Sequence, residues 1–380
     1  MKPLAGLLVL EFSQYLSGPS ATLRLADLGA RVIKIERPSG GDGNRHLSLG
    51  VDFEGDSLLF KTINRDKESY AVDLKNPTGL AKVKKLAAQA DILVENFRPG
   101  VMRKLGLDPE SVRSYNPGLV YGRITGYGDT GPWKDKPGQD LLVQSLSGLA
   151  WLNGNQDQPP MPFGLAVADM MSGSHLAQGI LAALVRRERT GLGGLIEVSL
   201  MESILDLQME VFTTYLNDGG KTPRRSLVNN AHAYLPAPYG IYRTKDGYLA
   251  MAMGSVQQLA QLLDCAKLRD FSGPEMGWSR RDEIKAVLAD HLVTRTTAEW
   301  LAVLEPSDYW CSDVLTWERL LGLEVLEHLE MIQEVTQSAG RTFRTTRCPI
   351  RIDGEIFLSH DGAPRLGENT KAIDEEFLLP

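Results

Sequence analysis

One aspartate stands where a carboxylate could act as a nucleophile. Asp169 directly precedes an apolar stretch that predicts a helix, and it follows the uncharged run 161–168. A helix N-terminus stabilises an anion, so it would keep this carboxylate ionised and able to attack an electrophilic carbon such as that of a thioester. The alternative is a structural role, because aspartate is also a favoured N-cap residue. From the residues alone both roles stay open.

A second group of polar side chains follows the predicted strands. The carboxyl ends of parallel strands share one edge of a sheet, where open α/β folds bind their ligands. Arg and Lys pair with phosphate through charge-assisted hydrogen bonds, so this group could bind a small ligand that carries phosphates. Each of them taken alone is more simply explained as ordinary surface charge. The group consists of Arg37, Lys75, Asn96, Arg98, Arg103 and Lys104.

Other common catalytic motifs are missing from the sequence. The first predicted βα loop, residues 13–20, lacks a G-x-G-x-x-G fingerprint, which argues against a dinucleotide even though Glu36 stands where such folds keep a ribose-binding acid. There is no G-x-x-x-x-G-K loop, and Ser147 lacks the first glycine of a G-x-S-x-G elbow. His175 lies about 240° around a helix from Asp169, so we expect no pairing between them.

Composition and charge restrict the class of protein. The 380 residues are 43% hydrophobic and 23% charged, with a net charge of −7. So acidic a chain would repel nucleic acid and anionic membranes, and we expect neither as a partner. The widely spaced Cys265, Cys311 and Cys348 form no C-x-x-C pair, which predicts reduced thiols in a cytoplasmic protein with no metal site. No run of about 20 apolar residues occurs, and the apolar run 7–10 is too short for a signal peptide.

The elements that must position these residues alternate between strand and helix. The first forty residues predict a βαβ unit, which implies a parallel sheet and a right-handed crossover. The alternation continues to about residue 216 and predicts a Rossmann-like α/β domain. The predicted strands are 7–12, 31–36, 91–94, 119–124 and 195–198, and the predicted helices are 21–28, 77–90, 98–105, 140–149, 170–189 and 201–216.

A change in composition divides the chain after residue 217. The polar stretch 218–223 predicts a linker, and 239–253 predicts two strands around a Lys-Asp-Gly turn. Helices are predicted at 256–264, 281–292 and 297–304, and a strand pair at 350–353 and 355–358. We therefore expect 1–200 to form the N-terminal part of a large domain, 201–224 a linker helix, 225–320 a small α+β domain and 321–380 a return segment that completes the large domain.

Five sequence blocks resemble the family III CoA-transferases, the group that contains formyl-CoA transferase and the carnitine CoA-transferase. The resemblance is continuous from about residue 3 to residue 215 and is looser beyond. Five blocks in the same order make chance similarity very improbable. They are LAGLLVLEFSQYLSGPSATLRLADLGARVIKIERPSGGD, NRDKESYAVDLKNP, ADILVENFRPGVMRKLGL, NPGLVYGRITGYGDTGP and GLAVADMMSG.

The resemblance implies an enzyme that moves coenzyme A from an acyl-CoA to a carboxylic acid, with Asp169 as its catalytic residue. The carboxylate would attack the acyl-CoA thioester, form a mixed anhydride and release the CoA thiolate. That thiolate would then give an aspartyl-CoA thioester and the free donor acid, after which the acceptor acid and the returning thiolate complete the new acyl-CoA. Such an exchange needs no ATP, no metal and no permanently bound cofactor, and coenzyme A is a substrate.

The same resemblance implies an assembly and a set of CoA contacts. The family's ring-shaped monomers interlock as a homodimer, with each active site at the subunit interface. The family's Gly-rich loop corresponds to Met253-Gly254-Ser255, whose single glycine argues against a mobile lid. Succinate, oxalate and carnitine-like acids are all compatible with the family. The implied CoA contacts are Gln14, Tyr15, Arg37, Leu74, Lys75, Asn96, Phe97, Arg98, Met102, Arg103, Lys104 and Lys136.

Three other functions remain as alternatives. An α-methylacyl-CoA racemase of the same fold would need a histidine before an aspartate where this chain has Gln139-Asp140, and an amide cannot act as a base near neutral pH. A non-catalytic CoA-binding protein would not need Asp169. A nucleotide-dependent oxidoreductase would need the missing glycine fingerprint.

Overall fold

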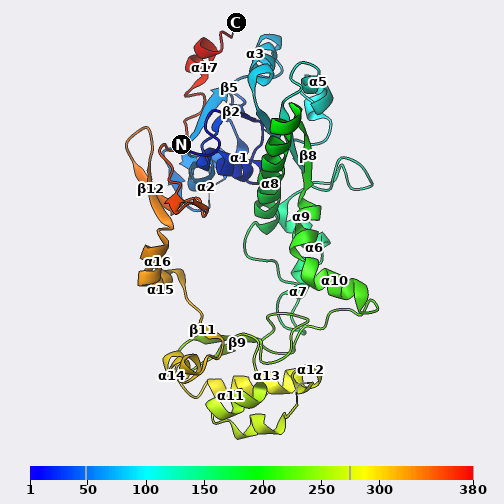
Figure 1. The fold of residues 1–380 in the computed structure, drawn as a ribbon, viewed down its shortest axis with the longest axis vertical. Coiled ribbons are helices and arrows are strands. Elements are labelled where there is room, and N and C mark those ends of the chain that lie inside the picture. Colours follow the sequence, from blue (N-terminus) through cyan, green and yellow to red (C-terminus); the bar gives the residue numbers. More distant parts are fainter. Residues whose placement is uncertain (48, 274, 380) are drawn as a thin grey trace. The chain divides into compact units, whose positions relative to one another are not determined.

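The computed structural model describes residues 1–47, 49–273 and 275–379, which form two compact units. The larger unit contains residues 1–143, residues 166–206 and the chain from Glu327 onward. The smaller unit contains residues 144–165 and 207–326. Figure 1 traces the chain through both units. The larger unit is therefore built from three separate stretches of sequence.

A parallel six-stranded sheet forms the centre of the larger unit. Its strand order is β5-β2-β1-β6-β7-β8, and every pairing is parallel. Numbered along the chain, this is the order 3-2-1-4-5-6 of doubly wound nucleotide-binding folds, and it reverses between β1 and β6. The predicted parallel α/β sheet is thus confirmed. The strands are β1 (Leu8–Glu11), β2 (Arg31–Glu36), β5 (Lys67–Ala71), β6 (Ile92–Glu95), β7 (Val120–Thr125) and β8 (Gly194–Ser199).

Helices cover both faces of this sheet. On one face an apolar cluster joins the strands to α3, α5 and α17, and it includes the fully buried Leu86, Val112 and Ile373. On the other face α8 lies against α1 and covers β7 and β8 (Figure 1). The helices are α1 (Ser17–Asp27), α2 (Leu58–Ile63), α3 (Pro77–Gln89), α4 (Val101–Leu105), α5 (Pro109–Arg113), α8 (Val167–Thr190) and α17 (Thr370–Glu376), with the 3-10 helix η1 (Gly43–His46).

The C-terminal segment returns to the edge strand β5. Asn369 N donates to Ser69 O at 3.1 Å, and Ser69 N donates to Asn369 Oδ1 at 2.9 Å. Ala71 N donates to Thr370 Oγ1 at 2.9 Å. These bonds satisfy backbone groups that an edge strand would otherwise leave open.

Three short strand pairs complete the larger unit. The predicted pair near residues 350–358 forms, but its two strands pair with each other and not with the six-stranded sheet. The pairs are β3 (Asp52–Phe53) with β4 (Asp56–Ser57), β12 (Ile332–Thr336) with β13 (Thr342–Thr346), and β14 (Arg351–Ile352) with β15 (Glu355–Ile356).

The smaller unit packs helices against a three-stranded antiparallel sheet of order β11-β10-β9. The predicted hairpin is confirmed, because β9 and β10 pair on either side of the Lys-Asp-Gly turn. Trp300 is fully buried at the centre of the apolar core, and its Nε1 donates to Leu292 O at 2.8 Å. The strands are β9 (Gly240–Arg243), β10 (Tyr248–Met251) and β11 (Cys311–Asp313).

The remaining helices belong to the smaller unit or run between the two units. Those within the smaller unit are α7 (Leu149–Leu152), α10 (Met209–Asn217), α11 (Val256–Leu262), α12 (Met276–Ser279), α13 (Arg281–Leu292), α14 (Thr297–Leu304) and α15 (Trp317–Leu321), with the 3-10 helices η2 (Ala266–Asp270) and η3 (Glu305–Ser307). The helices α6 (Asp140–Leu146), α9 (Leu200–Leu207) and α16 (Glu324–Leu329) run from one unit into the other.

Several helix boundaries differ from the predictions. The helix α8 begins at Val167, earlier than predicted, so Asp169 lies inside its first turn and does not precede it. The single helix predicted over 201–216 is two helices, because the backbone at Gln208 interrupts it. The helix predicted over 140–149 ends at Leu146. Composition does not locate these breaks, because the same residue types continue across them.

Candidate active site

Asp169 lies in the first turn of α8, beside the start of α1. The Ser17 hydroxyl donates a hydrogen bond to its carboxylate. The N-cap residue Ala166 makes no side-chain cap bond, whereas Asp140 Oδ1 accepts a hydrogen bond from Ala168 N at 2.7 Å. Asp140, and not Asp169, therefore caps the N-terminus of α8. The Asp169 carboxylate is left facing Ser17.

A glycine on α8 allows this helix to approach α1 closely. A Cβ at Gly173 would lie 2.1 Å from Ser20 Oγ and 2.7 Å from Ser17 O, so no larger residue fits there. Gly173 is one turn beyond Asp169 on the same helix. The close packing thus fixes the distance between the Asp169 carboxylate and the N-terminal turn of α1.

The surroundings of Asp169 raise its pKa to about 7, compared with 3.8 for an ordinary aspartate. Burial is the largest cause, the negative charge of Asp140 adds to it, and the hydrogen bond from Ser17 acts in the opposite direction. The sequence predicted that the helix N-terminus would keep this carboxylate ionised. With a pKa of about 7, however, Asp169 is only partly ionised at neutral pH. A carboxylate whose conjugate acid has a pKa near the working pH is more basic than an ordinary one, which favours nucleophilic attack.

The loops after β1 and β6 meet where the strand order reverses. Asn96 Oδ1 accepts a hydrogen bond from Gln14 N at 2.8 Å, and Asn96 Nδ2 donates to Gln14 O at 2.8 Å. The same Nδ2 donates to Ser17 Oγ at 3.3 Å. Hydrogen bonds therefore run from Gln14 through Asn96 and Ser17 to Asp169. Doubly wound folds bind their ligands in the crevice outside this point of the sheet.

Most of the other predicted CoA contacts lie in loops at the same edge of the sheet. The five cationic side chains among them that precede residue 105 are all exposed. This edge therefore carries exposed positive charge suited to phosphate groups. The predicted contacts at this edge are Tyr15 after β1, Arg37 after β2, Leu74 and Lys75 after β5, Phe97 and Arg98 after β6, and Met102, Arg103 and Lys104 in α4.

Among the predicted contacts, Met102 differs from the others in its burial and Lys136 differs in its place along the chain. Met102 is buried in the apolar cluster beside the sheet, so its side chain stabilises the position of α4. Lys136 lies in the loop after β7, with Nζ 4.4 Å from the centroid of the Trp133 ring. Neither belongs to the hydrogen-bonded chain that joins Gln14 to Asp169.

The segment Met253-Gly254-Ser255 is anchored at its glycine and at its serine. A Cβ at Gly254 would lie 2.5 Å from Tyr309 Oη, so the glycine backbone packs directly on the phenol. Ser255 caps α11, and its Oγ accepts a hydrogen bond from Gln258 N at 3.2 Å. Both contacts are made to residues of the smaller unit.

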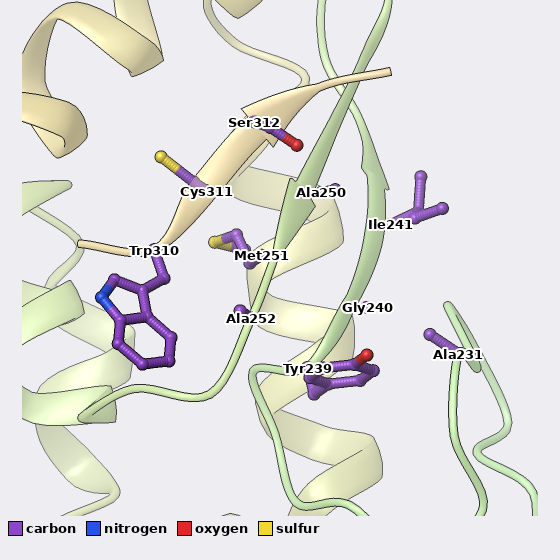
Figure 2. A pocket seen from close by; sticks show the side chains of 10 residues that line it. All are labelled: Ala231, Tyr239, Gly240, Ile241, Ala250, Met251, Ala252, Trp310, Cys311 and Ser312. Atoms are coloured by element: carbon purple, nitrogen blue, oxygen red, sulfur yellow. The ribbon is translucent and has the colours of Figure 1, made fainter. Parts of the chain in front are cut away.

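The smaller unit has a pocket of about 430 Å³ beside its sheet (Figure 2). Tyr239 and Ile241 line it from the β9 side and Trp310 from the β11 side. None of its lining residues is charged, so it suits an apolar group more than a carboxylate or a phosphate. The lining residues are Ala231, Tyr239, Gly240, Ile241, Ala250, Met251, Ala252, Trp310, Cys311 and Ser312.

A Ser-His-Asp arrangement on α8 and α9 does not form a hydrolytic site. His175 Nδ1 lies 3.0 Å from Ser203 Oγ, and His175 Nε2 lies 3.3 Å from Asp206 Oδ2. Ser203 is only 1% exposed, so its hydroxyl is closed to a substrate. His175 instead joins the two helices.

Within residues 1–47, 49–273 and 275–379, no group of three or more His, Cys, Asp or Glu side chains could hold a metal ion. Across those same ranges, every helix is too short or too polar to cross a membrane.

Sequence reasoning missed two residues of the site. Ser17 was not singled out, although it directly follows the loop between β1 and α1. In the sequence, Asp140 is notable as the residue after Gln139 and as the first residue of a predicted helix. Asp140 acts through a contact with α8 that is 28 positions away along the chain, and Ser17 lies farther still from Asp169, so no local pattern reveals either role.

Known proteins resemble this chain over nearly its whole length. The family model described as CoA-transferase family III matches residues 4–370. The succinyl-CoA:glutarate CoA-transferase of Mus musculus is 33% identical over 385 residues, which cover 100% of this chain and 87% of that protein. The acetyl-CoA:oxalate CoA-transferase of Acetobacter aceti is 32% identical over 391 residues, which cover 100% and 96%. A crystal structure of a CAIB/BAIF family protein from Brucella suis superimposes with a TM-score of 0.85 at 30% identity, covering 99% of both chains.

Proposed function

This chain belongs to family III of the CoA-transferases, and on that premise we propose that it transfers coenzyme A between two carboxylic acids through covalent intermediates on Asp169. One observation carries the proposal. The partly buried Asp169 carboxyl, with a pKa near 7, is joined by hydrogen bonds through Ser17 and Asn96 to the ligand-binding edge of the sheet. The proposed nucleophile and the loops after β1 and β6 thus lie at one site within the larger unit.

The reaction proceeds by exchange of acyl bonds at the Asp169 carboxyl. The ionised carboxylate attacks the thioester carbon of the acyl-CoA, and the C–S bond breaks to give a mixed anhydride and the CoA thiolate. The thiolate attacks the Asp169 side of the anhydride, which gives an aspartyl-CoA thioester and the donor carboxylate. The acceptor carboxylate attacks that thioester, and the released thiolate then attacks the acceptor side of the second anhydride. Asp169 is regenerated as a carboxylate, and no proton is transferred at any step.

The charge of Asp140 favours the covalent intermediates. An anhydride or a thioester at Asp169 is uncharged, so its formation removes the repulsion between the two carboxylates. Ser17 donates to the carboxylate and holds it toward the binding loop. The neighbours of Asp169 thus raise the reactivity of the nucleophile while keeping it oriented.

We propose that the exposed cations at the sheet edge bind the phosphates of CoA. Arg37, Arg98 and Arg103 can each make charge-assisted bonds to a phosphate. Relatives named for succinyl-CoA, glutarate and oxalate support a short dicarboxylic acid as donor or acceptor. Screening the purified protein with succinyl-CoA and acetyl-CoA against a panel of such acids would identify the pair.

We further propose that the enzyme is a homodimer, interlocked as its family implies. The helices α10, α15 and α16 have no buried residue. They expose large apolar side chains that include Met209, Trp317 and Val325. Exposed apolar surface on this scale is typical of an interaction site, and a second copy would cover it.

Trapping with hydroxylamine tests the covalent mechanism. Incubation with an acyl-CoA and hydroxylamine should convert Asp169 into a hydroxamate detectable by peptide mass spectrometry. Asp169→Ala should abolish both the adduct and turnover while CoA binding stays within about threefold, since the change removes a reacting group and not a phosphate contact. Asp157→Ala, which changes an exposed acid, is the matched control. Turnover by Asp169→Ala near the wild-type rate would refute the proposal, and exchange of the α-proton with solvent deuterium would favour the racemase instead.

A further inference from the structure

The loop after β1 holds a tyrosine in an unusual backbone conformation. Tyr15 has a φ of 63°, in the left-handed region that residues other than glycine and asparagine seldom adopt. Its side chain is 55% exposed, so burial of the ring does not account for this conformation. Other contacts must stabilise the backbone here.

The segment 42–44 fixes both backbone polar groups of Tyr15. Tyr15 N donates to Asp42 Oδ1 at 3.1 Å, and Asn44 Nδ2 donates to Tyr15 O at 3.2 Å. Asp42 Oδ1 also accepts a hydrogen bond from Asn44 N at 2.9 Å. The loop after β2 therefore determines the backbone conformation of the loop after β1.

A buried lysine fixes Asp42 in turn. Lys34 Nζ lies 2.9 Å from Asp42 Oδ2 and 2.8 Å from Glu11 Oε1, and it donates to Ser13 O at 2.8 Å. The side chains of Lys34 and Asp42 are at most 1% exposed. Breaking such a buried pair is costly, because it leaves an uncompensated charge in a medium of low dielectric constant. One ammonium group therefore ties both loops to the end of the sheet.

The Tyr15 ring rests on a residue without a side chain. A Cβ at Gly43 would lie 2.7 Å from Tyr15 Oη and 2.9 Å from Tyr15 Cζ. Gly43 has no positive φ, so its backbone conformation is open to other residues. The lack of a side chain at this position therefore serves the placement of the ring.

We propose that Asp42 and Gly43 form a seat for Tyr15 that sets the affinity for acyl-CoA. Asp42 holds the tyrosine backbone in the left-handed conformation, and Gly43 leaves room for the ring beside it. Both are positioning residues, and neither takes part in acyl transfer. A ring held in place before the ligand arrives does not have to be ordered on binding, which strengthens binding. The inference rests on the proposed function, in which Tyr15 contacts coenzyme A.

The substitution Gly43→Ala tests the seat, because it displaces the ring and leaves the buried ion pairs intact. The half-exposed ring can rotate away, so thermal unfolding should be unchanged. The Kd for CoA by calorimetry and the KM for acyl-CoA should rise about tenfold, the equivalent of one contact of about 1.4 kcal/mol. The kcat and the KM for the acid should stay within about twofold. Gly118→Ala is the matched control, since its Cβ would meet neighbours only at 3.6 Å or more.

A double mutant separates the seat from a general effect at residue 43. Tyr15→Asn removes the ring and tolerates the left-handed backbone. In that background, Gly43→Ala should have no further effect on either constant. Unchanged CoA affinity in folded Gly43→Ala, a fall in kcat alone, or the same tenfold loss without Tyr15 would each overturn the seat and leave the transferase proposal standing. A wild-type protein that binds no CoA would instead overturn the proposed function, and this inference with it.

Discussion

Replacing Asp140 by asparagine should move the pH dependence of the reaction to lower pH. The side-chain oxygen of the new amide would still accept the hydrogen bond from Ala168 N, so the start of α8 should keep its cap. The substitution removes only the negative charge that helps to raise the pKa of Asp169. Since attack requires the carboxylate, the ionised fraction of Asp169 sets the rate at low pH.

The size of the effect follows from the causes of the raised pKa. Burial is the largest cause of the rise from 3.8 to about 7 and Asp140 the second, so the pKa of Asp169 in the variant should fall but stay above that of an ordinary aspartate. We expect the midpoint of the kcat/KM profile to fall from near 7 by about one pH unit, or about 1.4 kcal/mol. At pH 6 the ionised fraction would increase from roughly a tenth to roughly a half, which is about a fivefold gain in rate.

The opposite shift is expected for Ser17→Ala. The hydrogen bond from Ser17 lowers the pKa of Asp169, so its loss should raise the midpoint. Asp140→Ala is a further control, because it should shift the midpoint downward and also cost about 1 kcal/mol of stability through the lost cap. The assay is initial-rate kinetics with acyl-CoA from pH 5 to 9. If Asp140→Asn left the midpoint unchanged, or if Asp140→Asn and Ser17→Ala moved it in the same direction, the assigned electrostatics would be wrong.

Two further predictions concern α8. Asp169→Asn should be inactive but more stable than the wild type at pH 8 by about 2 kcal/mol, because the pKa of Asp169 is higher in the folded than in the unfolded protein. A pKa difference of about three units corresponds to about 4 kcal/mol, and the partial exposure of Asp169 reduces this value. This gain in the free energy of unfolding should shrink as the pH falls from 7 to 4. Urea unfolding at fixed protein concentration measures it, and a gain that stayed constant with pH would contradict the reasoning. Gly173→Ala should cost about 1–3 kcal/mol of stability and lower kcat, because its Cβ would press on Ser20 and move α8 away from α1; thermal unfolding equal to that of Gly118→Ala would contradict the close packing.

The sequence predicted most of the central sheet but missed one of its strands. The runs 7–12, 31–36 and 119–124 are apolar or alternate clearly, and they form β1, β2 and β7. The missed strand β5 begins with the buried Lys67, whose Nζ lies 2.8 Å from Glu11 Oε2. A fully buried cation breaks the apolar pattern of a strand, and only its distant partner makes it tolerable. The strand β11 of the smaller sheet was also missed, for a different reason: its three residues are too few to show an alternating pattern.

Only some features of the candidate site follow from patterns along the chain. Asp169 is notable in the sequence because an uncharged run and an apolar helix flank it, and the order of the strands indicates the loops that we propose bind CoA. The effect of Ser17 on the pKa of Asp169 depends on the packing of α8 against α1, and the effect of Asp140 depends on its contact with Ala168 at the start of α8. A pattern along the chain contains neither contact. The left-handed Tyr15 likewise depends on Asp42, a contact between two loops.

The bond between Ser69 and Asn369 joins positions that are 300 residues apart. Synthesis from the N-terminus therefore produces the strands of the sheet long before the segment that covers β5, and the smaller unit can fold in the interval. Until that segment arrives, β5 has a row of unpaired backbone groups, which is a template for joining another chain. Nascent or truncated chains should for this reason depend on chaperones in a way that the finished enzyme does not.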